Sequence, residues 1–153
     1  MAGFSIDKNK IKRLLPVFVM GLSVLGLVDA AFLTFKHYTG GDIKCFVVSG
    51  CDIVTSSQYS VLFDLIPLAL MGVLFYFTAL LLAFVVVETD AKKIKFFLWA
   101  WSGLGVLSSL WFLYIQAVIL EAYCFYCLVS IINTILIFGI VSTILFLDKK
   151  LKN

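Results

Sequence analysis

Apolar side chains fall into four long runs along the chain. They cover residues 14–35, 65–87, 96–119 and 124–147, and polar or charged segments separate them. Each run has about 22–24 residues, enough for an α-helix rising 1.5 Å per residue to cross a hydrocarbon core about 30 Å thick. Because backbone polar groups in lipid must be satisfied within the segment, we expect four transmembrane helices rather than strands.

The composition agrees with this pattern. Of the 153 residues, 63% are hydrophobic and 14% are charged, and the mean hydropathy is +1.11. A soluble domain of this length cannot bury so much apolar surface. We therefore expect a single integral membrane domain over residues 1–153, without a second, soluble domain. No basic patch is interleaved with aromatic residues, so the sequence gives no support for nucleic-acid binding.

The basic residues are distributed unevenly between the polar segments. Ten of the twelve lie before the first run, between the second and third runs, or after the fourth: Lys8, Lys10, Lys12, Arg13, Lys92, Lys93, Lys95, Lys149, Lys150 and Lys152. Such segments are typically cytoplasmic. The expected fold is an all-α bundle of four transmembrane helices with both termini in the cytoplasm. The polar segment of residues 36–64 then forms an extracytoplasmic loop long enough to cap the helix ends.

The beginning of the chain has an alternative interpretation. Lysines, an apolar run and the sequence VDAA are also compatible with a secretory signal cleaved after Ala30. The apolar run continues beyond that point into FLTF, however, and its removal would leave an odd number of helices. We therefore keep the first run as a transmembrane helix.

Two cysteines, Cys124 and Cys127, begin the fourth run. Residues three apart share a helix face, and a helix N-terminus stabilises a thiolate on the first cysteine. Cys127 lies one turn deeper, so the pair can exchange electrons with aqueous thiols and with a carrier dissolved in lipid. A structural disulfide or two unreactive thiols is the alternative. A zinc site lacks ligands because His37 is the only histidine, and Leu128 stands where covalent haem attachment requires histidine.

A second cysteine pair, Cys45 and Cys51, lies in the segment of residues 36–64. A disulfide that staples the loop in an oxidising compartment is one interpretation. Two pairs on the same side of the membrane favour another, a relay by thiol–disulfide exchange. Four cysteines allow three connectivities, and the sequence alone does not choose between them.

Several segments together resemble the vitamin K epoxide reductase family, in particular its short bacterial and archaeal members. The matching segments are AAFLTFKHYTGG, CFVVSGCDIVTSSQYSVLF, IPLALMG, GLGVLSSLWFLYIQ and AYCFYCLVS, in the order of the family. They cover most of residues 21–135. The short CxxC motif is weak evidence by itself, whereas the ordered set is highly specific.

The resemblance implies a four-helix bundle around a quinone. It implies that a thioredoxin-like partner reduces the loop pair, which reduces the CxxC pair, which reduces the quinone. By this resemblance Cys45 meets the partner, Cys51 forms a transient disulfide with Cys124, and Cys127 lies beside the quinone ring. The chain has no fused thioredoxin-like domain, so we expect a separate partner protein outside the cytoplasm. The implied role is to support disulfide formation in exported proteins, from the plasma membrane of a prokaryote.

Candidate quinone-binding residues are Cys127, Ser57, Trp111 and Ile131. Ser57 matches a family serine near the active site, although a serine that caps a helix or turn is equally compatible. Trp111 lies deep in the third run, where it can line the pocket or pack between helices. Ile131 is four residues after the CxxC motif, where the animal enzymes have a substrate-polarising tyrosine. The resemblance therefore implies quinone reduction rather than epoxide reduction, and it does not distinguish menaquinone, ubiquinone or a vitamin K form.

Three ionisable residues near the cysteines have open roles. Asp29 lies within the first run, and an acid inside a membrane is a candidate functional group. It could pass protons to the reduced quinone, or lie near the outer interface. His37 could pass protons between the loop and water, and Glu121 fits a solvated turn residue.

Two other functions are compatible with parts of the sequence. One is a non-catalytic membrane protein held by two inert disulfides. The other is the second bacterial family of quinone-linked thiol oxidases, in which the CxxC pair comes first. The order is reversed in this chain, which argues against that family.

Overall fold

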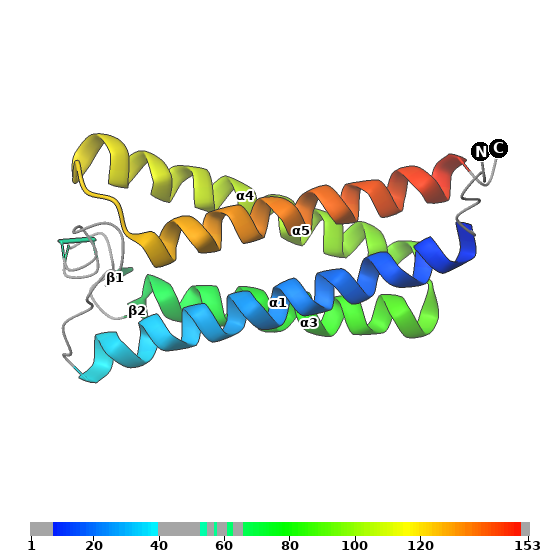
Figure 1. Ribbon diagram of the computed structural model, residues 1–153, viewed down its shortest axis with the longest axis horizontal. Coiled ribbons are helices and arrows are strands. Elements are labelled where there is room, and N and C mark those ends of the chain that lie inside the picture. Colours follow the sequence, from blue (N-terminus) through cyan, green and yellow to red (C-terminus); the bar gives the residue numbers. More distant parts are fainter. Residues whose placement is uncertain (1–7, 40–52, 55–56, 58–60, 63–65, 151–153) are drawn as a thin grey trace, which may run out of the picture.

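The computed structural model describes residues 8–39, 53–54, 57, 61–62 and 66–150, and it forms a four-helix bundle (Figure 1). The four long helices and the short elements between them follow each other as α1 (Lys8–Thr39), β1 (Val61–Leu62), β2 (Ile66–Pro67), α3 (Leu68–Thr89), α4 (Lys92–Tyr114), η2 (Ile115–Ile119) and α5 (Phe125–Lys150). β1 and β2 pair antiparallel, with Val61 opposite Pro67.

The four predicted membrane helices are confirmed. The structure contains four helices long and apolar enough to cross a membrane, the third of them α4 continued by η2. α1 has 32 residues, so it extends beyond the first apolar run at both ends. The third run changes hydrogen-bonding pattern near its end, because η2 is a five-residue π-helix. The protein is thus an all-α integral membrane bundle.

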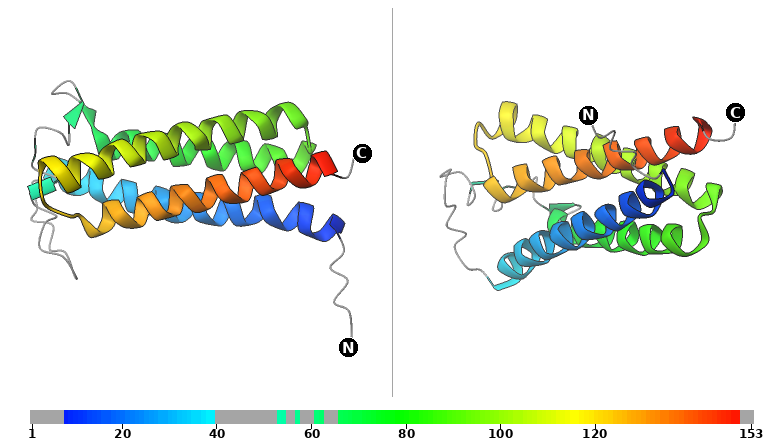
Figure 2. Two further views of the ribbon diagram at one scale, coloured as in Figure 1. Left: turned by 90° about the horizontal axis from the view of Figure 1, so that it is seen from above. Right: turned by 45° about the vertical axis from the view of Figure 1, so that its right-hand side comes forward.

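The two ends of the bundle differ in what they contain. Figure 1 shows β1, β2, the end of α1 at Thr39 and the start of α5 together at one end, which we call the cysteine end. The α3–α4 connection, the start of α1 and the end of α5 lie at the opposite end, which we call the terminal end. The further views in Figure 2 show the same arrangement. The CxxC motif is therefore a full bundle length away from the start of α1 and the end of α5.

Glycines allow the helices to approach closely at two positions. A Cβ atom on Gly26 of α1 would lie 2.3 Å from Tyr76 Cε1 on α3 and 2.6 Å from Asn133 Nδ2 on α5. A Cβ atom on Gly105 of α4 would lie 2.4 Å from Phe75 Cζ. Small residues at such contacts are typical of membrane bundles, where van der Waals packing holds the helices together.

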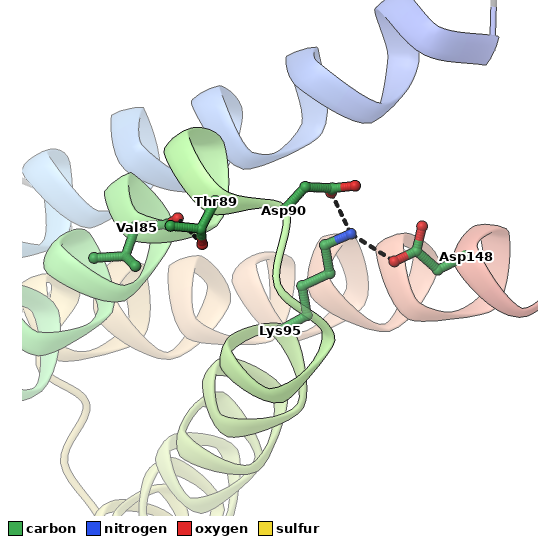
Figure 3. A network of polar contacts seen from close by, with 5 residues as sticks. All are labelled: Val85, Thr89, Asp90, Lys95 and Asp148. Atoms are coloured by element: carbon green, nitrogen blue, oxygen red, sulfur yellow. Dashed lines mark hydrogen bonds and ion pairs between the residues drawn. The ribbon is translucent and has the colours of Figure 1, made fainter.

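An ion cluster around a buried lysine joins three segments at the terminal end (Figure 3). Lys95, near the start of α4, contacts Asp90 and donates to Asp148 Oδ2 on α5 at 2.5 Å. Its side chain is only 3% exposed. Asp90 ends α3 in the left-handed region, with φ of 49°. Lys95 counts among the basic residues that predict the cytoplasmic side, but in the structure it is a neutralised, buried ammonium group rather than a solvated loop charge.

Candidate functional site

The CxxC pair lies where α5 begins. Cys124 immediately precedes α5, and its carbonyl accepts the first helical hydrogen bond, from Leu128 N at 3.0 Å. Cys124 is fully buried and Cys127 is half-buried, and both are free thiols. The predicted placement in the opening turn is thus confirmed, with Cys124 as the capping residue.

Gln116 holds the backbone of Cys124 in place. Its Oε1 accepts a hydrogen bond from Cys124 N at 3.0 Å, and its carbonyl accepts one from Ala122 N at 3.1 Å. Gln116 lies in η2 and is completely buried. The chain then turns at Glu121, which has a φ of 47°. The π-helix and this turn together carry the backbone from the end of one span to the start of the next.

Sequence reasoning missed Gln116, although a signal was available. An amide in an apolar run must find hydrogen-bond partners when it is buried. The Nε2 atom of Gln116 has none among the described residues. Among the described residues, the amide is therefore held through its oxygen.

The surroundings of Cys124 favour its thiolate. A hydrogen bond from the Cys127 thiol holds the pKa of Cys124 below its ordinary value. Burial opposes this shift, whereas the backbone N–H groups of Cys127 and Tyr126 add to it, and the charge of Asp29 opposes it. The lowered pKa is expected for a sulfur at the N-terminus of a helix. This shift favours Cys124 as the nucleophilic member of the pair.

A cavity of about 820 Å³ occupies the half of the bundle next to the cysteine end. α1, α3, α4, α5 and Pro67 form its wall, and Cys127 is part of it. Exposed wall residues come from α3 and α4, among them Leu74 and Trp111. The cavity thus reaches the outer surface of the bundle along these two helices. Its volume is within the usual range of sites for small molecules, about 300–1,000 Å³.

The cavity has one fixed polar group on α3. The Tyr76 hydroxyl lies 2.7 Å from Ser130 Oγ and 3.0 Å from Thr134 Oγ1, and it donates to the Ser130 carbonyl at 2.9 Å. All three residues line the cavity. This network ties α3 to α5 one turn beyond Cys127, and sequence reasoning did not single it out.

The predicted quinone-binding residues have different positions. Cys127, Trp111 and Ile131 all line the cavity. The Trp111 ring stacks on Tyr114, with centroids 6.0 Å apart, and the residue is 66% exposed. Ser57 donates to the Val54 carbonyl at 2.8 Å and is not among the wall residues that the structure describes.

Cys45, Cys51 and most of the expected capping loop lie outside the described residues. One described part of that segment, Val54, is 1% exposed and belongs to an apolar cluster with Cys124, Leu33 and Ala122. Val54 also lines the cavity. The chain three residues after Cys51 therefore packs against the CxxC turn.

Asp29 and His37 share a face of α1. They are eight residues apart, and both line the cavity with Leu33 between them. Asp29 Oδ2 is buried and has no hydrogen-bond partner among the described residues. His37 is exposed. The same wall of the cavity thus runs from a buried carboxyl group to an imidazole at the cysteine end.

Comparison with known families adds to this geometry. The profile described as "Vitamin K epoxide reductase family" matches residues 17–142, an interval that contains all four cysteines and the whole cavity wall. Comparison with curated proteins finds no match to this chain. Because the family profile covers well over half of the chain, this integral membrane protein belongs to the vitamin K epoxide reductase family of quinone-linked thiol oxidoreductases.

Proposed function

We propose that the protein transfers electrons from a thioredoxin-like protein outside the cytoplasm to a membrane quinone and thereby supports disulfide formation in exported proteins. One observation carries the proposal: Cys127 lines the large cavity while its thiol is hydrogen-bonded to Cys124 at the helix end. A thiol pair so placed has one sulfur facing an apolar site and another facing the chain segment after Cys51.

The cavity fits a quinone headgroup in size and lining. Its wall is mostly apolar, includes Trp111 and Ile131, and reaches the bundle surface where lipid would lie. A bound quinone accepts two electrons and two protons. Ile131 offers no hydroxyl for polarising an epoxide, which supports quinone reduction. The polar groups on the wall include Asp29 and the network of Tyr76.

The proposed electron path is serial. The partner's dithiol becomes a disulfide and reduces Cys45–Cys51, and the Cys51 thiolate exchanges with the Cys124–Cys127 disulfide through a transient Cys51–Cys124 bond. Two electrons pass along each step. The burial of Val54 against Cys124 supports this exchange, because it anchors the chain just after Cys51 at the CxxC turn.

The proposed orientation places the cysteine end outside the cytoplasm. Lys92, Lys93, Lys149 and Lys150 lie in exposed positions at the terminal end, and such basic residues favour the cytoplasmic side. Lys95 does not contribute to this asymmetry as a free charge, because two carboxylates neutralise it. The remaining basic residues still favour the same side.

The test is absorbance-followed quinone reduction by the purified protein in detergent. A reduced thioredoxin-like protein is the electron donor, and menaquinone and ubiquinone analogues are the acceptors. We expect turnover by the wild type and none by Cys127→Ala, and we expect Cys127→Ala to accumulate a Cys51–Cys124 disulfide on peptide mapping. Folded protein without turnover on any of these quinones would contradict the proposal. Finding only Cys45–Cys51 in Cys127→Ala would contradict the assigned order of the cysteines.

A further inference from the structure

Asp29 is the one carboxyl group that the structure describes in the cavity wall. It lies on α1, and in its ionised form its charge opposes the thiolate of Cys124 across the bundle. The Oδ2 atom is buried, and among the described residues no group donates to it or accepts from it. A buried polar atom without a partner costs free energy. Such an atom in a cavity wall is available to a ligand.

Several other polar groups on the wall already have partners. The Tyr76 hydroxyl is engaged by Ser130 and Thr134. Ser108 Oγ donates to the carbonyls of its own helix, to Gly105 O at 2.9 Å. Asp29 is therefore the wall residue best placed to exchange a proton with a molecule in the cavity.

Reduction of a quinone requires two protons, and the cysteine pair as described supplies only one. Cys124 reacts as a thiolate, which is the nucleophilic form of a cysteine, whereas the Cys127 thiol donates a hydrogen bond to Cys124 and so carries a proton. Oxidation of the pair to a disulfide then releases two electrons and one proton. A second proton donor is needed inside the cavity.

We propose that Asp29 is a catalytic residue that supplies this second proton. The inference rests on the proposed function. In the step, Cys124 and Cys127 form a disulfide and give up two electrons. Cys127 gives up its thiol proton and Asp29 its carboxyl proton, so that a quinone leaves as a hydroquinone and Asp29 remains as a carboxylate.

Asp29 then regains its proton from water. His37 lies two turns further along the same face of α1, lines the same cavity and is exposed. The path from water to Asp29 therefore follows α1 past Leu33. The titratable groups that line the cavity with Asp29 are His37 on α1, Tyr76 on α3 and Cys127 on α5, and Cys124 is the further one whose charge state Asp29 affects. The described wall residues of α4 include no titratable group.

The test compares Asp29→Asn with the wild type in two half-reactions. We expect Asp29→Asn to accept electrons from the reduced partner at the wild-type rate and to reduce quinone about 10²-fold more slowly, within the usual contribution of a general acid. Asp29→Glu should restore most of the rate. The matched control is Glu88→Gln, which makes the same kind of change on an exposed acid near the terminal end.

A merely electrostatic role for Asp29 predicts the opposite sign. Its charge opposes the thiolate at Cys124, so a neutral residue in its place would favour the thiolate and leave quinone reduction as fast or faster. Quinone reduction by Asp29→Asn at the wild-type rate or faster would overturn the proposal. A second readout does not depend on turnover. The infrared spectrum of the quinone-free protein should contain a protonated carboxyl band that is absent in Asp29→Asn and present in Glu88→Gln, and its absence from the wild type would also overturn the proposal.

The same experiment separates this inference from the proposed function. If the wild type itself fails to reduce quinone, the proposed function is wrong. If the wild type reduces quinone and Asp29→Asn does so equally well, the proposed function stands and the role of Asp29 is wrong.

Discussion

Replacing Gly26 by alanine should push apart the three helices that meet at Tyr76. The added Cβ atom would lie 2.3 and 2.4 Å from two atoms of the Tyr76 ring. The Tyr76 ring is 1% exposed, and the hydrogen bonds of its hydroxyl to Ser130 and Thr134 oppose any shift of the ring. The strain must therefore displace α1 or break these hydrogen bonds.

Gly21→Ala is a matched control on the same helix. A Cβ atom there has no neighbour within 4 Å. Both substitutions gain the same helix propensity, about 0.5–1 kcal/mol, so this gain cancels when they are compared. The difference that remains is an overpacking cost of about 1–3 kcal/mol and about 1 kcal/mol for a weakened buried hydrogen bond. We expect Gly26→Ala to be less stable than Gly21→Ala by about 2–4 kcal/mol.

Thermal unfolding in one detergent measures this difference. A chain of this size loses about 2–4 °C per kcal/mol, so the two midpoints should differ by about 4–16 °C on the same scale. Adding Tyr76→Phe to Gly26→Ala separates the two costs, because it removes the hydroxyl and keeps the ring. Coinciding midpoints of Gly26→Ala and Gly21→Ala would refute the close contact between α1 and α3.

Three further predictions concern polar groups. Lys95→Met removes the ammonium partner of Asp148, whose side chain is 11% exposed, and should lower the free energy of unfolding in detergent by about 3–5 kcal/mol. Adding Asp148→Asn to Lys95→Met should recover part of that loss. A double variant no more stable than Lys95→Met would contradict this prediction. Gln116→Leu leaves the buried N–H of Cys124 without its acceptor, so it should cost about 1–3 kcal/mol by the same assay, and unchanged stability would argue against that bond. With Cys45 and Cys51 replaced by serine, ultraviolet titration should find the Cys124 thiolate persisting to lower pH than an ordinary cysteine, about 8.5, and being lost only as pH falls through the lowered pKa. Cys127→Ala should raise that midpoint because it removes the largest cause of the shift, and an unchanged midpoint would contradict this cause.

The membrane bundle and the place of the CxxC pair could be predicted from the sequence because both depend on local patterns. Runs of apolar residues predict the membrane spans, and the CxxC pair lies where the fourth run begins. The role of Lys95 was not predictable in this way. Its partner Asp148 is 53 residues away, and only the packing of α4 against α5 brings the two together.

The candidate site was predictable only in part for the same reason. Ile131 and Cys127 are four residues apart on one helix face, so their shared position follows from helical geometry. Gln116 and Tyr76 gave weaker signals, because a polar side chain in an apolar run shows that a partner exists but not which one. Tyr76 finds its partners at Ser130 and Thr134 across the bundle. Such contacts depend on tertiary packing, which the periodicity of apolar residues along the chain does not predict.

The ion cluster at the terminal end has a consequence for how the bundle is assembled during synthesis. Asp90 and Lys95 belong to one helical hairpin, so they can pair as soon as the third span has left the ribosome. Asp148 joins them only after nearly all of the fourth span has been made and has docked against α4. The ion pair between Lys95 and Asp148 is therefore the last of the two to form. Until Asp148 arrives it has a single carboxylate partner and remains close to the aqueous boundary, and afterwards its burial marks the completed bundle.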